Sequence, residues 1–136
     1  GDRSIEVAYF ADMIEHVPQP ARVLAEIRRV ADQLVCIVPI ERGIIADLHH
    51  RWRVLRGKQT TREMFGHLHR FRTAEVRRLL RETGFSILRC RVIAAPGVHP
   101  ATFLGRLYQA PQRLTRRVLF LHRWLYGNTT LVAWCQ

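Results

Sequence analysis

Five polar residues could carry acid–base chemistry, and they fall at two places in the chain. Three of them follow directly after an apolar segment near the start, and two histidines come much later. They are Asp12, Glu15, His16, His67 and His69. Histidine is the usual general base near neutral pH, and carboxylates complement positive charge. These residues are therefore the first candidates for a catalytic or cofactor-binding site.

The remaining histidines and the cysteines give no metal motif. The pair His49-His50, even combined with the two later histidines, lacks the spacing of a known zinc site. Cys36, Cys90 and Cys135 lie far apart among apolar neighbours, which argues against a disulfide framework and a zinc knuckle. We expect no metal, and a reducing, cytoplasmic setting.

The composition bounds the class of protein. The chain has 136 residues, of which 48% are hydrophobic, so it fits one globular domain or part of one and is not disordered. No apolar run approaches the roughly 20 residues of a membrane span. The net charge is +11, and Lys58 is the only lysine among 22 basic residues. A basic surface suits phosphate, nucleic acid or an anionic membrane, but the arginines are scattered, so nucleic acid is not favoured.

Alternating strands and helices should position these residues. Apolar runs predict strands, amphipathic repeats predict helices, and prolines and glycines mark their ends. The strands are expected at 4–11, 34–38 (stopped by Pro39), 85–93 and 129–135, and the helices at 20–30, 44–55, 73–83 (capped by Thr73) and 111–126, with a loop at 94–111. Such alternation is typical of an α/β fold with a mostly parallel sheet.

Several motifs carry a family resemblance. The segment FADMIEHVP (10–18), the helix LAEIRRV and the strand LVCIVP are similar to the second half of class I S-adenosylmethionine-dependent methyltransferases. The closest resemblance is to the ubiquinone-biosynthesis O-methyltransferases, of methyltransferase type 11. The stretch GHLHRFRT (66–73), followed by Gly84-Phe85, also resembles that family. The resemblance implies a Rossmann-like sheet of order 3-2-1-4-5-7-6 with an antiparallel last strand.

The chain also departs from the family pattern. It starts at what would be strand 4, so N-terminal strands 1–3 are missing, with their glycine-rich turn and the acidic residue that holds the ribose. We therefore interpret residues 1–136 as the C-terminal part of a single methyltransferase domain, either a fragment or half of a split protein. Alone it is expected to be inactive.

The resemblance implies a cofactor and a set of site residues. S-adenosylmethionine would lie against Phe10, Ala11, Asp12, Glu15 and His16. His16, His67 and His69 are the candidates for a general base, because methyl transfer to a hydroxyl needs little else beyond alignment. The alternative is structural: Glu15 and His16 would brace the next helix, and the two later histidines would anchor a loop.

Residues 41–72 are too long for a simple connection. They leave a strand at its carboxyl end, and we predict a substrate lid that favours anionic groups. Its candidate residues are Arg42, Arg51, Trp52 and Arg53. The alternative is a solvated helix face. The helix expected at 111–126 combines apolar and arginine residues, which suits packing on the sheet or contact with a membrane surface or lipid-linked substrate.

Three functions remain open from the sequence. The first is methyl transfer from S-adenosylmethionine to a small-molecule or lipid-linked acceptor, with the missing N-terminal half as partner. The second is a non-catalytic, methyltransferase-like subunit that pairs with another chain. The third, supported by charge alone, is a basic nucleic-acid-binding module. The expected location is cytoplasmic, with peripheral membrane contact as a further alternative.

Overall fold

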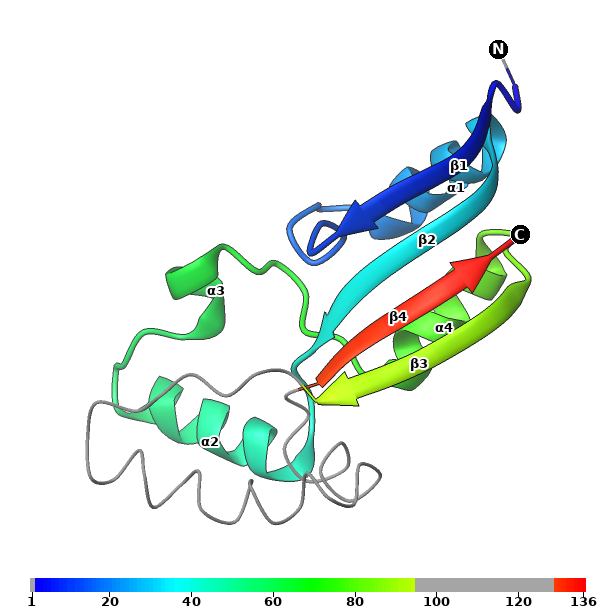
Figure 1. The fold of residues 1–136 in the computed structure, drawn as a ribbon. Helices are drawn as coiled ribbons and strands as arrows, with labels where there is room; N and C mark the ends of the chain where they lie inside the picture. Colours follow the sequence, from blue (N-terminus) through cyan, green and yellow to red (C-terminus); the bar gives the residue numbers. More distant parts are fainter. Residues whose placement is uncertain (1, 95–128) are drawn as a thin grey trace.

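Four strands and four helices make up the part of the chain that the computed structural model describes, residues 2–94 and 129–136 (Figure 1). In chain order they are β1 (Ile5–Ala11), α1 (Pro20–Val30), β2 (Ala31–Ile40), α2 (Ile44–Leu55), α3 (Thr61–Phe65), α4 (Thr73–Glu82), β3 (Ile87–Ala94) and β4 (Thr129–Cys135). The loop and helix expected at 94–111 and 111–126 lie outside the described residues, apart from the end of β3. Within these ranges no helix is both long and apolar enough to cross a bilayer.

The strands form one mixed sheet of order β1-β2-β4-β3. β1 and β2 are parallel, whereas β4 lies antiparallel between β2 and β3. Two of the three pairings are therefore antiparallel, so the sheet is mixed where the alternation of elements predicted a mostly parallel one. The order and the reversed last strand agree with strands 4-5-7-6 of the sheet that the resemblance implies.

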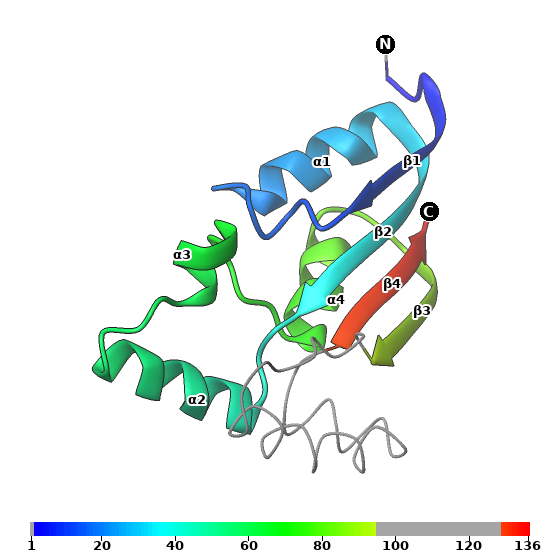
Figure 2. The ribbon, with the colours of Figure 1, turned by 60° about the vertical axis from the view of Figure 1, so that its left-hand side comes forward.

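Helices α1 and α4 cover one face of the sheet (Figure 2). Leu24 of α1 and Leu80 of α4 are fully buried, as are Val38 of β2 and Leu131 of β4. Alternate residues of β2 and β4 point into this core, which is the pattern expected when only one face of a strand is covered. The core therefore lies between these two helices and the sheet.

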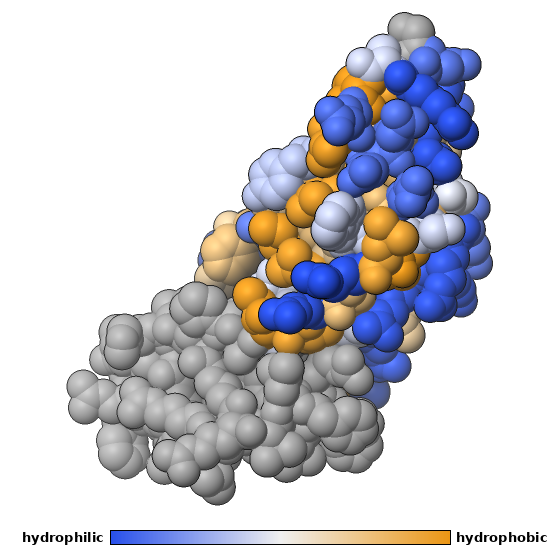
Figure 3. Space-filling view, turned by 45° about the vertical axis from the view of Figure 1, so that its right-hand side comes forward, coloured by the Kyte–Doolittle hydropathy of each residue, from blue (hydrophilic) through white to orange (hydrophobic). Residues whose placement is uncertain are grey.

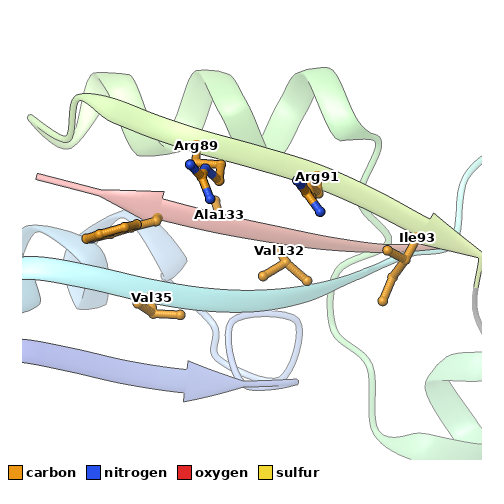
Figure 4. Close-up of a pocket in the computed structure, with 7 residues that line it drawn as sticks. Val35, Arg89, Arg91, Ile93, Val132 and Ala133 are labelled. Carbon is orange, nitrogen blue, oxygen red and sulfur yellow. The ribbon is translucent and has the colours of Figure 1, made fainter.

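The opposite face of the sheet is open to solvent in the described part of the chain. Val7 and Tyr9 of β1 are 46% and 64% exposed, and Trp134 of β4 is also exposed. Figure 3 shows apolar residues on this face, interspersed with hydrophilic ones. A shallow depression of about 190 Å³ runs between Arg89, Arg91, Val132 and neighbouring side chains of the central strands (Figure 4). This open face has the character of a surface that another layer covers.

Three local expectations need correction. Pro39 does not stop β2, because the pairing with β1 already ends at Ile37 and Pro39 has only β4 beside it. Thr73 is not the cap of α4 but its first residue, and Arg72 is the N-cap, whose N–H donates to Glu75 Oε2 at 2.8 Å. The short helix α3 was not expected, since five residues carry no clear periodicity.

Candidate functional site

The chain leaves β1 by a sharp turn that starts the candidate site. Asp12 adopts a left-handed conformation with φ of 48°, which aspartate tolerates better than most residues. Its N–H donates to the Ile37 carbonyl at 3.1 Å, so the β1–β2 ladder extends to the turn. The following residues place Glu15 in the interior and His16 near the surface. The turn thus lies at the carboxyl end of β1, as predicted.

A second segment is held against this turn by backbone hydrogen bonds. The N–H groups of Leu68 and His69 both donate to the Glu15 carbonyl, at 2.7 and 3.0 Å. This contact brings the ring of His67 to 4.8 Å from the ring of His16, in an edge-to-face arrangement. Residues far apart in sequence therefore meet beside the ends of β1 and β2.

Glu41 fixes the orientation of His67. It follows β2 directly, and its Oε1 lies 2.6 Å from His67 Nδ1. A carboxylate accepts the hydrogen bond, so Nδ1 carries a proton, and in the neutral form of the ring Nε2 keeps a lone pair. Both side chains are largely buried. A carboxylate that orients an imidazole is the arrangement found at many general bases and metal ligands.

Glu15 is the most unusual member of the site. Its side chain is 1% exposed, and neither carboxylate oxygen has a hydrogen-bond partner. Oε1 lies 3.9 Å from His16 Nε2, too far for a hydrogen bond. Burial raises the pKa of Glu15, with a smaller upward contribution from Asp12 and downward ones from its own backbone and the two histidines. We call Glu15, His16, Glu41 and His67 the strand-end cluster.

The remaining sequence candidates have different surroundings. His69 Nε2 lies 3.0 Å from the Val17 carbonyl and the ring stacks on Phe71, so this histidine anchors the loop. Phe10 is buried in the core and presents only its backbone at the strand end. Ala11 and Asp12 are exposed there.

The segment 41–72 leaves the end of β2 and carries α2 and α3 away from the sheet (Figure 1). Arg42 is tied down at its base by ion pairs to Asp47 at 3.6 Å and Glu75 at 3.1 Å. Arg53 Nε donates to the Gln59 carbonyl at 2.8 Å. Two of the four predicted arginine and tryptophan residues are thus engaged within the protein.

The other two predicted lid residues remain open to solvent. Arg51 and Trp52 are both exposed on α2. The Trp52 ring is flanked by the cationic groups of Arg56 and Lys58, at 5.5 and 5.6 Å from its centroid. No residue of α2 is buried, and apolar side chains such as Leu48 and Leu55 are also exposed. The helix therefore offers apolar and positively charged groups together.

Sequence reasoning missed one residue and one grouping at this site. The sequence does not reveal Glu41 as a partner of His67, and the position of Glu41 directly after a buried strand is the available signal. Among the described residues, His49 and His50 do not join His67 and His69 in a group with metal-compatible geometry. Instead, among residues 2–94 and 129–136, one group has metal-compatible geometry, Glu15, His16 and His67, with ligand atoms within 4.8 Å of one another.

Comparison with solved structures identifies the fold. A Bacillus halodurans protein assigned as a methyltransferase matches with a TM-score of 0.62 at 12% identity, over 98% of this chain and 70% of its own. A SAM-dependent methyltransferase of Thermotoga maritima matches with a TM-score of 0.58 at 16% identity, over 98% and 57%. The Haloferax volcanii complex of the Trm112 methyltransferase activator with a protein assigned as a methyltransferase gives 0.56 at 17% identity, over 98% and 54%.

These matches define the class of fold as the Rossmann-like fold of S-adenosylmethionine-dependent methyltransferases. This chain spans between about half and 70% of the length of these three neighbours. No family model and no curated protein sequence matches the chain. The methyltransferase fold is thus established, while the type 11 subtype remains a prediction.

Proposed function

We propose that residues 1–136 form the C-terminal part of a single methyltransferase domain, which moves a methyl group from S-adenosylmethionine to a small-molecule acceptor. The observation that carries this proposal is the strand-end cluster. It lies at the carboxyl ends of two parallel strands, where open α/β sheets bind their ligands. The match to a SAM-dependent methyltransferase supports the same function.

The residues after β1 fit the cofactor. S-adenosylmethionine supplies, when bound, a methyl group on a positively charged sulfur. Ala11 exposes only a methyl side chain, so a ligand can approach the backbone closely, and the carboxyl groups of Asp12 and Glu15 on this turn would complement the positive charge of a sulfonium. His16 borders the same space. Phe10 would contribute its backbone rather than its ring, because the ring packs in the core.

We place the remaining cofactor contacts in strands 1–3 of the same domain, outside residues 1–136. Two observations support this placement. β1 is an edge strand with an exposed Tyr9, and one face of the sheet is uncovered in the described residues. A further strand beside β1 and a further layer on the open face would satisfy both.

The acceptor would be held by the strand-end cluster. Glu41 keeps the proton of His67 on Nδ1, so His67 Nε2 can take the proton of an acceptor hydroxyl as its oxygen forms the new bond to carbon. His16 lies against this ring and can orient the same hydroxyl. His69 contributes by anchoring the loop that carries His67.

Segment 41–72 is our candidate for the substrate lid. Arg51 and Trp52 are exposed, whereas Arg42 and Arg53 hold the segment in shape. Exposed apolar and cationic groups on α2 favour an acceptor with an apolar body and an anionic group, and a lipid-linked molecule meets this description.

Label transfer tests the function. The product of the complete gene is incubated with methyl-labelled S-adenosylmethionine and acceptors that pair a hydroxyl with an anionic group. We expect His67→Ala to slow transfer by about 10²–10⁴-fold, the usual contribution of a general base. Arg78→Ala, on the outer side of α4, is the control and should keep full activity. Absence of cofactor binding by the complete product would refute the proposal.

The open sheet face favours a second candidate, a methyltransferase-like subunit that pairs with another chain. The face combines exposed Val7, Tyr9 and Trp134 with Arg89 and Arg91, which suits an apolar partner that also carries acidic groups. Light scattering of the complete gene product separates the two functions. A monomer that binds S-adenosylmethionine supports the enzyme, and a stable hetero-complex without cofactor binding supports the subunit.

A further inference from the structure

The two ends of segment 41–72 are fastened to each other beside the strand-end cluster (Figure 2). The backbone N–H groups of Glu41 and Arg42 both donate to the Phe71 carbonyl, at 3.2 and 3.3 Å. We call this contact the neck of the segment. His67 follows α3 on the returning part of the segment and reaches Glu41 at the neck. The neck therefore joins the helix-bearing segment to the candidate general base.

Arg70 lies at the neck and contacts two carboxylates. Its Nη2 donates to the Glu41 carbonyl at 3.1 Å, and its Nε lies 3.8 Å from Glu41 Oε2. The same Nη2 lies 3.3 Å from Oδ1 of Asp47, in the first turn of α2. The Arg70 side chain is 20% exposed, and the two carboxylate side chains are 18% and 25% exposed. Partly buried pairs of this kind are screened less by salt than surface pairs.

The contacts of Arg70 make one continuous path from helix α2 to the imidazole of His67. Asp47 joins α2 to the guanidinium, and the guanidinium joins Glu41. Glu41 Oε1 in turn lies 2.6 Å from His67 Nδ1, so one oxygen of this carboxylate serves the imidazole and the other faces Arg70. A guanidinium is planar and presents its donors in a fixed fork, so its orientation limits where both carboxylates can lie.

The path is close to complete, with room to tighten. Within the described part of the chain, Arg70 Nε, Glu41 Oε2 and Asp47 Oδ1 are buried and have no hydrogen-bond partner. These atoms face one another across the ion pairs of 3.8 and 3.3 Å. Hydrogen bonds of about 2.9 Å would form after movements of less than about 1 Å. A ligand that draws α2 toward the neck would thus fix Glu41 and, with it, the ring of His67.

We propose that Arg70 is a positioning residue, which links the position of α2 to the orientation of the His67 ring through Glu41. The inference rests on the proposed function where it treats His67 as the general base, whereas the link itself can be measured without a substrate. If Arg70 is lost, the Glu41 carboxylate is free to rotate, and the ring loses its fixed direction. A base displaced by about 1 Å can slow a reaction about 10²-fold.

Proton exchange at the His67 ring tests the link directly. The product of the complete gene is labelled with ¹⁵N-histidine, and the Nδ1–H signal of His67 is assigned by its loss in His67→Gln. A hydrogen bond to a fixed, partly buried carboxylate protects this proton from exchange with water. We expect Arg70→Ala to speed the exchange about tenfold or more, and Asp47→Asn, which cuts the link at α2, to speed it about threefold.

Two matched variants separate positioning from charge. The Arg72 side chain pairs with Asp47 at 3.0 Å and, in the described residues, not with Glu41, so Arg72→Ala should leave exchange within about twofold of wild type. Arg70→Lys keeps the positive charge but loses the planar fork, and its exchange rate should fall between wild type and Arg70→Ala. Circular dichroism confirms each fold, and Asp47→Asn keeps the side-chain volume, so the test remains decisive if Arg70→Ala unfolds.

Methyl transfer shows whether the link serves the reaction. The assay uses methyl-labelled S-adenosylmethionine and the hydroxyl-bearing anionic acceptors of the label-transfer experiment. We expect Arg70→Ala to lower kcat about 10–100-fold with a smaller change in KM, because the general base is displaced more than the acceptor. Faster proton exchange with an unchanged kcat would overturn the positioning role.

The proton-exchange outcomes are independent of the proposed function. Exchange that neither Arg70→Ala nor Asp47→Asn changes would overturn the inference. Slower exchange in Arg70→Ala would overturn it too, because a Glu41 carboxylate that merely lost a neighbouring charge would hold the Nδ1 proton more tightly. If His67→Ala keeps full methyl transfer, the general-base role is refuted, and the exchange rates alone decide on the link.

Discussion

Replacing Glu15 by glutamine should make the protein more stable at neutral pH. Burial raises the pKa of this carboxyl above that of an exposed glutamate, so the folded state holds a proton that the unfolded state has lost. The stability that this proton provides is complete below the unfolded pKa of about 4.3 and is lost as the pH rises through the folded pKa. Glutamine has no charge to bury and therefore avoids that loss.

The magnitude follows from the surroundings of the side chain. Neither oxygen of Glu15 is hydrogen-bonded, and the side chain is almost fully enclosed. An unsatisfied buried polar group costs about 1–3 kcal/mol, and more when charged. We expect Glu15→Gln to raise the free energy of unfolding by about 1–3 kcal/mol at pH 7.

Urea unfolding measures this effect at pH 7 and at pH 4. The wild-type and variant curves should differ at pH 7 and converge at pH 4, with equal slopes against urea. A variant less stable than wild type at pH 7 would show that the carboxylate is paired in the folded protein. That result would contradict the description of Glu15 as a buried carboxylate without a hydrogen-bond partner.

Three further outcomes follow from the fold. Gly84 has a φ of 88°, so Gly84→Ala should lower the free energy of unfolding by about 1–2 kcal/mol in urea titrations, although Arg28 Cγ leaves room for the methyl group at 3.7 Å. Arg42→Ala removes the ion pairs at the base of segment 41–72, and trypsin should then cleave α2 faster while global stability changes by less than about 1 kcal/mol. Tyr9→Asp places a charge on the open sheet face, and light scattering should show less self-association of the chain at high concentration; an unchanged profile would mean that this face does not associate.

Much of the fold could be predicted from local sequence signals. Pro20 begins α1, and Gly84 follows the end of α4 with the positive φ that its position required. β1 and β4 were predicted to within a residue because short apolar runs bounded by turn residues are strong signals. The residue pattern alone does not fix the direction of β4, because that direction depends on which strands β4 joins, and only the family resemblance implies the antiparallel arrangement that is observed.

The candidate site was predictable only in part, because its geometry depends on contacts between distant segments. The turn from Ala11 to His16 lies at the strand end, where the motif indicated. The meeting of His67 with Glu41 and His16 depends on backbone hydrogen bonds to the Glu15 carbonyl, which no periodicity reveals. Likewise, the anion-binding expectation for Arg42 could not anticipate its ion pairs with α4.

The place of β4 in the sheet has a consequence for biosynthesis. Residues 129–135 fill the gap between β2 and β3, and their side chains Leu131, Ala133 and Cys135 complete the core. While the ribosome is still translating, β2 and β3 lack their common neighbour and cannot pair with each other across its position. The nascent polypeptide must therefore keep β3 unpaired and one edge of β2 open, and this part of the sheet should close only after residue 135 has left the exit tunnel.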